Sequence, residues 1–135
     1  MAQDALSKLL SSRDWLMADG ATGTNLFNLG LSSGEPPEFW NTDEPDNIRS
    51  LYRSAVEAGS DIFLTNSFGG NAARLKLHSA QGRVRELNKV AAALGREIAD
   101  ASGRTEGIFS VSAKVMPVDS GWNTVAPPCL PFRRS

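Results

Sequence analysis

The chain is poor in the residues that build disulfide-stabilised or metal-stabilised small domains. Its 135 residues include one cysteine, Cys129, and one histidine, His78. A single cysteine excludes an internal disulfide framework, and a structural zinc site usually takes four Cys or His ligands. We therefore expect a reduced, cytoplasmic protein with no metal site of its own.

An excess of charge of one sign and long apolar runs are also missing. The chain has 14 basic and 15 acidic residues, a net charge of −1, whereas nucleic-acid-binding and membrane-surface proteins usually carry a basic excess. No apolar run approaches the ~18 residues of a membrane span. Residues 1–4 have neither the basic nor the apolar region of a secretory signal. We expect neither a nucleic acid nor a membrane as partner, while a second copy of the chain stays a candidate.

Short apolar runs alternate with helical patterns along the sequence. The apolar runs predict strands at residues 15–18, 62–64 and 108–112. Helical patterns cover 4–12, a stretch from Pro45 to a C-cap at Gly59, 71–78 and about 83–101, and Thr24 is expected to cap a helix that starts near Asn25. This order predicts an α/β fold with a parallel sheet whose strands are covered on both faces.

The pattern is lost after about residue 112. Residues 113–135 hold four of the seven prolines and Cys129, with neither helical nor alternating periodicity. We therefore expect one domain over residues 1–112 and a divergent, disordered tail over 113–135.

Two polar clusters follow the first two predicted strands, where ligands bind in parallel α/β folds. The first begins at Asp19-Gly20, and its carboxylate could accept a hydrogen bond from an ammonium group or cap local amides. The second is Thr65-Asn66-Ser67, followed by Phe68 and the pair Gly69-Gly70. Its flexible backbone could hold a carboxylate through amide groups, or the loop could satisfy its own backbone.

An aromatic residue stands in the turn-rich stretch 30–45, within the segment PPEFWN. This tryptophan, Trp40, could line a pocket and face a quaternary ammonium group, or it could pack as a lid over the sheet. Long ordered loops are often functional, and both interpretations stay open at this point.

Three segments together resemble the start of the homocysteine S-methyltransferases. They are LMADGATGTNL, PPEFWN and EAGSDIFLTNSFGGNAARLKL, and the resemblance covers about residues 5–112. These segments are similar in sequence to those of bacterial betaine–homocysteine methyltransferase-like proteins. The same domain is the N-terminal domain of cobalamin-dependent methionine synthase. The resemblance implies the N-terminal portion, about three βα units, of a (β/α)₈ TIM barrel.

The resemblance also implies a chemistry and a set of binding residues. In the family a zinc-bound homocysteine thiolate takes a methyl group from a donor such as glycine betaine, a methylsulfonium or a methylated corrinoid, and methionine results. By position, Asp19 and Gly20 would hold the homocysteine amino and carboxylate groups, with Thr65, Asn66 and Ser67 beside them. Trp40 and Phe68 would be the donor-side aromatics.

The sequence departs from the family pattern in two places. Betaine-using relatives place a tyrosine where this chain has Gly69, which leaves the donor open. The family's zinc thiolates lie in an Asn-Cys and a Gly-Gly-Cys-Cys segment, neither of which occurs here. We therefore expect a truncated, inactive methyltransferase. The alternatives are a non-catalytic α/β binding module, and the same enzyme class with a methylsulfonium, folate or corrinoid donor.

Overall fold

A computed structural model describes residues 5–103 and 109–111. Along the chain its elements are α1 (Ala5–Ser12), α2 (Thr22–Asn28), the 3₁₀ helix η1 (Pro37–Phe39), α3 (Trp40–Asp43), α4 (Pro45–Glu57), β1 (Ile62–Leu64), α5 (Ala72–Lys76), η2 (Gln81–Arg83), α6 (Val84–Ala101) and β2 (Phe109–Val111). The described residues are mostly helical, with two short parallel strands separated by helices, so the predicted α/β class is confirmed in part. The predicted tail and Cys129 lie outside the described residues.

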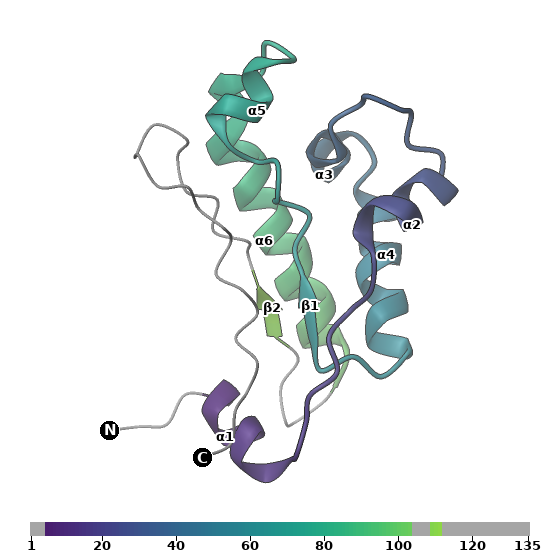
Figure 1. Ribbon diagram of the computed structural model, residues 1–135, viewed down its shortest axis with the longest axis vertical. Coiled ribbons are helices and arrows are strands. Elements are labelled where there is room, and N and C mark those ends of the chain that lie inside the picture. Colours follow the sequence, from purple (N-terminus) through teal and green to yellow (C-terminus); the bar gives the residue numbers. More distant parts are fainter. Residues whose placement is uncertain (1–4, 104–108, 112–135) are drawn as a thin grey trace.

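The sheet is parallel, and each crossover within it contains a long helix. β1 and β2 pair with Ile62 opposite Phe109, and Ala18 forms a single parallel bridge to Ile62 on the other side of β1. The backbone bonds Asp19 N–H to Ile62 O at 2.9 Å and Asp61 N–H to Met17 O at 2.7 Å hold the first segment in register. Figure 1 shows β1 and β2 side by side, with α6 and α4 running along them. The expected third βα unit is not confirmed.

The predicted strand at 15–18 is wrong in extent and in burial. Only Ala18 pairs, and Trp15 and Met17 are 67% and 43% exposed. In β1, likewise, Phe63 is buried while Leu64 is 45% exposed. A parallel strand is covered on both faces only where other elements pack on both of them. Among the described residues, helices cover the face that carries Phe63, and the opposite face is left open.

The two long helices form where the sequence placed them. α4 begins at Pro45, whose fixed φ suits the first turn, and Gly59 follows its end with a φ of +98°. α6 buries Leu87, Leu94 and Ile98 on one face, which is the spacing of an amphipathic helix. Their apolar faces meet over Phe63 in one core cluster, which consists of Leu26, Leu31, Trp40, Ile48, Tyr52, Phe63, Leu94, Ile98 and Ala99.

The segment between the first strand and α4 is more helical than predicted. α2 begins at Thr22 with Ala21 as its N-cap, and no side chain caps it. Thr24 therefore lies inside the helix, and its predicted capping role is wrong: the backbone becomes helical two residues before Thr24. The turn-rich stretch 30–45 contains η1 and α3, because Pro37 opens a helical turn at its favoured position.

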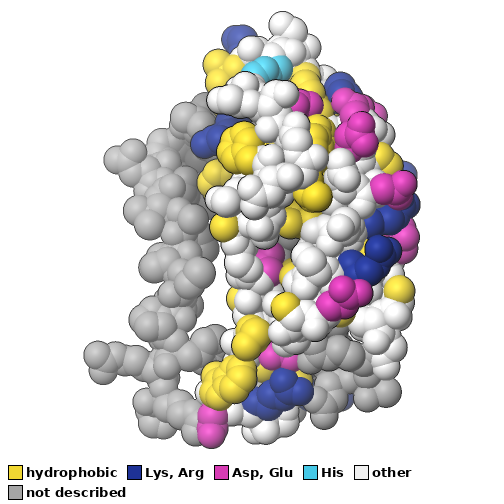
Figure 2. Space-filling model, turned by 90° about the vertical axis from the view of Figure 1, so that its right-hand side faces the viewer, with side chains coloured by type: hydrophobic (Ala, Val, Ile, Leu, Met, Phe, Trp, Pro, Cys, Tyr) yellow, Lys and Arg dark blue, Asp and Glu magenta, His cyan; other side chains and the backbone are white. Residues whose placement is uncertain are grey.

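The surface carries both signs of charge. Figure 2 shows Lys and Arg side chains lying among Asp and Glu side chains on the face in view. Arg49, for example, bonds both Glu97 at 2.9 Å and Asp46 at 2.9 Å. No helix among the described residues is long and apolar enough to cross a membrane.

Candidate functional site

A cavity of about 530 Å³ lies at the carboxyl end of β1. One wall is the segment that follows the strand, from Leu64 to Gly69, and a second wall is the loop from Gly34 to Glu38. α5 closes a third side with Arg74, Leu75 and His78 nearby. This volume falls within the ~300–1,000 Å³ typical of small-molecule sites. Four of the residues predicted for binding, Thr65, Asn66, Ser67 and Phe68, therefore line one cavity.

The loop after β1 satisfies part of its own backbone. Ser67 N–H donates to Thr65 O at 2.8 Å, Gly70 N–H to Ser67 O at 3.1 Å, and Asn71 N–H to Gly69 O at 2.8 Å. These three amides are therefore occupied within the loop and do not face a ligand carboxylate. What the loop offers to the cavity is side chains, above all the buried hydroxyl pair of Thr65 and Ser67, whose oxygens lie 2.8 Å apart.

Asn66 is the point at which three segments are joined. Its side-chain amide donates to Pro37 O at 2.8 Å and to Asn41 Oδ1 at 3.0 Å. Asn41 in turn donates to Asn66 O at 2.9 Å and to Leu87 O at 3.3 Å. Both side chains are buried, so these bonds form away from competing water. Asn66 thus fixes the loop of η1 against the loop after β1.

Tyr52, on α4, supports the same loop through a hydrogen bond to the Asn66 backbone. Its hydroxyl oxygen accepts the Asn66 N–H at 2.6 Å, and its ring packs on Phe63 with centroids 5.0 Å apart. Burial raises the pKa of Tyr52 to about 12; the Asn66 N–H opposes the shift and the negative charge of Asp19 adds to it. The hydroxyl therefore stays protonated at all ordinary pH values.

Two buried contacts explain why the loop contains two adjacent glycines. Gly69 N–H donates to Glu38 Oε1 at 2.5 Å, and a Cβ at residue 69 would lie 2.8 Å from that oxygen. A Cβ at Gly70 would lie 2.5 Å from Asn88 Oδ1, and Asn88 donates to Gly70 O at 2.6 Å. The glycines serve close approach, not the flexibility expected from the sequence.

Asp19 and Gly20 lie in a neighbouring cavity. It measures about 320 Å³, runs between the first strand segment and α4, and shares Thr22 with the larger cavity. Asp19 Oδ2 accepts the Leu64 N–H at 3.0 Å, so the carboxylate ties the first strand segment to the end of β1. Burial raises the pKa of Asp19, against the effect of the N–H groups of Leu64 and of Asp19 itself.

The two predicted donor-side aromatics differ in their placement. Trp40 is 6% exposed, belongs to the core cluster, and donates from Nε1 to Glu35 Oε1 at 3.1 Å. It does not line the cavity among the described residues, which matches the packing interpretation; its amphipathic ring fills the core while its N–H finds a carboxylate. Phe68 is 63% exposed at the cavity, with the Arg74 guanidinium 5.3 Å from its centroid.

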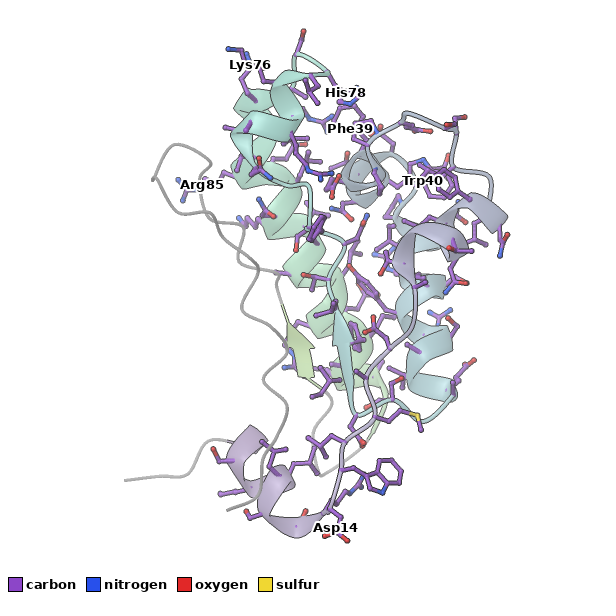
Figure 3. The ribbon with its side chains drawn as sticks, in the orientation of Figure 1. Asp14, Phe39, Trp40, Lys76, His78 and Arg85 are labelled. Carbon is purple, nitrogen blue, oxygen red and sulfur yellow. The ribbon has the colours of Figure 1, made fainter. Side chains whose placement is uncertain are left out.

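His78 stands at the rim of the cavity beside Phe39. The rings meet edge to face with centroids 6.2 Å apart, and Figure 3 shows both side chains where α5 approaches the loop that carries η1. Sequence reasoning missed Glu35, Glu38, Asn41, Tyr52 and Asn88. The segment PPEFWN was singled out for its tryptophan, yet its glutamate and asparagine are the residues that contact the binding loop.

The described residues do not fit a zinc ion. Nowhere in residues 5–103 do three or more His, Cys, Asp or Glu side chains gather as a metal would require. The groups around Thr65 and Ser67 are mainly hydroxyls, amides and carboxylates, with the imidazole of His78 at the cavity rim, whereas a zinc site usually takes several thiolate or imidazole ligands.

Comparison with known proteins identifies the family to which this chain, with its parallel strands and two cavities, belongs. A sequence model described as "Homocysteine S-methyltransferase" matches residues 16–124. This range covers both polar clusters and most of the chain, so the chain belongs to the homocysteine S-methyltransferase family.

Two similar relatives are much larger proteins. The chain is 32% identical over 94 residues to methionine synthase of Mycobacterium tuberculosis (strain ATCC 25618 / H37Rv), and the match covers 65% of this chain and 8% of that protein. It is 30% identical over 91 residues to methionine synthase of Mycobacterium leprae (strain TN), with 63% and 8% covered. The chain thus spans less than a tenth of these relatives.

Solved structures with the same fold include a homocysteine methyltransferase. The metallated form of MmuM from Escherichia coli superposes with a TM-score of 0.71 at 21% identity, covering 81% of this chain and 40% of that one. Its oxidized form gives a TM-score of 0.66 at 22% identity, with 82% and 40% covered. These likenesses establish the fold of the described part.

Proposed function

We propose that the chain supplies the homocysteine-binding front part of an S-methyltransferase, which transfers a methyl group from a donor to the homocysteine sulfur and gives methionine. Family membership supports this proposal, as do the name of MmuM and the names of the two methionine synthases. The barrel that the family resemblance implies would then extend beyond the part of the chain that the structure describes.

The observation that carries the proposal is the buried hydroxyl pair of Thr65 and Ser67 at the end of β1. Both side chains line the larger cavity, and both are nearly inaccessible to solvent. Buried hydroxyl groups can switch between donating and accepting, which suits an amino acid with a cationic and an anionic end. We assign the homocysteine amino acid moiety to this wall.

The remaining binding residues have separate roles in the proposal. Asn66 positions the wall through its bonds to Asn41 and Pro37. Asp19 and Gly20 reach homocysteine from the neighbouring cavity, through the side where Thr22 joins the two. Phe68 contacts the donor. Trp40 does not contact a ligand in this proposal; its hydrogen bond to Glu35 holds the loop that lines the cavity.

Isothermal titration calorimetry with L-homocysteine tests the assignment. The unmodified chain should bind L-homocysteine, and Thr65→Val should weaken binding about 10- to 100-fold, because one hydrogen bond to a charged ligand is worth ~1.5–3 kcal/mol. Thr24→Val, at an exposed position of α2, is the matched control and should leave the affinity unchanged. No measurable binding, or equal affinities for the two variants, would overturn the proposal.

A turnover assay distinguishes the methyltransferase interpretation from that of a non-catalytic binding module. With zinc, L-homocysteine and glycine betaine present, we expect no methionine from the isolated chain, which spans 40% of the MmuM chain. Turnover would contradict the expected inactivity. Homocysteine binding without turnover, followed by activity when the rest of a family barrel is supplied in trans, would favour the methyltransferase over a binding module.

A further inference from the structure

The larger cavity contains a buried carboxylate that the proposed homocysteine site does not use. Glu38 lies in η1 and is 5% exposed, although it lines the cavity. Within the described residues it accepts one hydrogen bond, from Gly69 N–H to Oε1, and forms no ion pair with a Lys or Arg side chain. A buried anion without a paired cation is costly unless a ligand compensates it.

The second carboxylate oxygen of Glu38 faces open space. Every fully enclosed side-chain oxygen among the described residues has a hydrogen-bond partner. Glu38 Oε2 has no hydrogen-bond partner among those residues. It therefore keeps some accessible surface, and the space that Glu38 borders is the cavity. A carboxylate fixed by one oxygen and open at the other is pre-organised to receive a positive charge, since no side chain has to be ordered on binding.

The neighbours of Glu38 suit a compact cation with an apolar surface. Phe68 lines the same cavity and already holds a cationic group, the Arg74 guanidinium, at 5.3 Å from its ring centroid. Aromatic faces attract methylated cations through their quadrupole. Arg74 is exposed and lines the cavity with Glu38, so the cavity offers one anionic and one cationic group to a zwitterionic ligand.

Gly69 adds an independent argument. A side chain at this position would run into Glu38, because its Cβ would lie 2.8 Å from Oε1 and 3.0 Å from Oε2. A carboxylate therefore fills the space beside residue 69, and a cation that enters the cavity there meets its negative charge.

We propose that Glu38 is the specificity residue for the methyl donor, and that it binds the positively charged, methylated atom of an onium compound. This inference rests on the proposed function. In the transfer, the thiol proton leaves to solvent and a sulfur lone pair forms the new C–S bond. The C–N or C–S⁺ bond pair stays on the donor, which leaves as a neutral amine or sulfide. Because the positive charge fades in the transition state, Glu38 favours donor binding and not the chemical step.

Two pairs of compounds that differ in charge at one atom test the inference. Glycine betaine and its carbon isostere 3,3-dimethylbutanoate share shape and carboxylate, but only the former is cationic. Dimethylsulfonioacetate and 3-methylbutanoate compare a sulfonium with its carbon analogue. By calorimetry, the unmodified chain should bind an onium compound at least about tenfold more tightly than its isostere, as for a charge-assisted contact of ~1.4 kcal/mol or more.

Glu38→Gln keeps an oxygen for the Gly69 N–H and removes the charge. It should weaken onium binding about tenfold and abolish the preference over the isostere, while L-homocysteine affinity stays unchanged. Glu57→Gln, at an exposed position of α4, is the matched control. The inference is overturned if the unmodified chain binds onium and isostere equally or not at all, or if Glu38→Gln keeps the preference. If the unmodified chain does not bind L-homocysteine, that result would instead contradict the proposed function.

Discussion

Replacement of Tyr52 by phenylalanine is the sharpest test of how the binding loop is held. The substitution keeps the ring, which packs on Phe63 at 5.0 Å, and removes only the hydroxyl that accepts the Asn66 N–H at 2.6 Å. The Asn66 amide then loses its acceptor in a buried place. Leaving a buried donor unsatisfied costs ~1–3 kcal/mol, so the free energy of unfolding at pH 7 should fall by that amount.

At high pH we expect an effect of the opposite sign, in which Tyr52→Phe loses less stability than the unmodified chain. Burial raises the pKa of Tyr52 to about 12 in the folded chain, against about 10 in an unfolded one. The tyrosine therefore contributes stability that is complete below pH 10 and is lost as the pH rises through 12. At pH 11 the unmodified chain should have lost about 1.4 kcal/mol, a loss that Tyr52→Phe escapes.

Urea unfolding of both proteins at pH 7 and pH 11 measures the two effects. The stability difference between them should shrink by about 1.4 kcal/mol at the higher pH, and groups common to both proteins cancel in that difference. The chain has one tyrosine, so tyrosinate absorbance reports its titration directly. A difference that does not change with pH, or a tyrosinate midpoint near 10, would refute the assignment of Tyr52 as a buried support.

Three further substitutions test the contacts around the cavity by urea unfolding. Gly69→Ala should cost ~1–3 kcal/mol, because its Cβ would push the Glu38 carboxylate away from the Gly69 N–H; an unchanged midpoint would contradict the close packing. Asn41→Ala should cost ~2–4 kcal/mol and should also weaken homocysteine binding, since Asn66 loses a partner; intact affinity would show that Asn66 needs no such support. Ile48→Ala, at a fully buried position of α4, should cost ~2–5 kcal/mol and leave the affinity of the remaining folded protein unchanged.

Local patterns in the sequence predicted the parts of the fold that local physics determines. The spacing of apolar residues located α4 and α6, and Pro45 and Gly59 marked the two ends of α4. The short run at 62–64 was identified as a strand and forms β1. In each case a single segment carries its own periodicity, cap or turn residue, so no knowledge of its neighbours was needed.

Contacts between distant segments could not be predicted in the same way. The Glu38–Gly69 bond joins residues 31 positions apart, and the Asn41–Asn66 pair joins residues 25 apart. No periodicity links PPEFWN to TNSFGG, and only the packing of η1 against the end of β1 brings them together. For the same reason Trp40, the most conspicuous side chain of that segment, was placed at the ligand, whereas it lies in the core.

The contacts around Asn66 imply that the two sides of the proposed site act as one unit. The homocysteine wall follows β1, and the donor residue Glu38 belongs to η1, which continues into α3. Four hydrogen bonds join the two segments: one from Asn66 to Pro37, two between Asn66 and Asn41, and one from Gly69 to Glu38. A displacement of either loop must therefore stretch bonds to the other. One hydrogen-bonded unit therefore positions both the proposed homocysteine wall and the proposed donor residue.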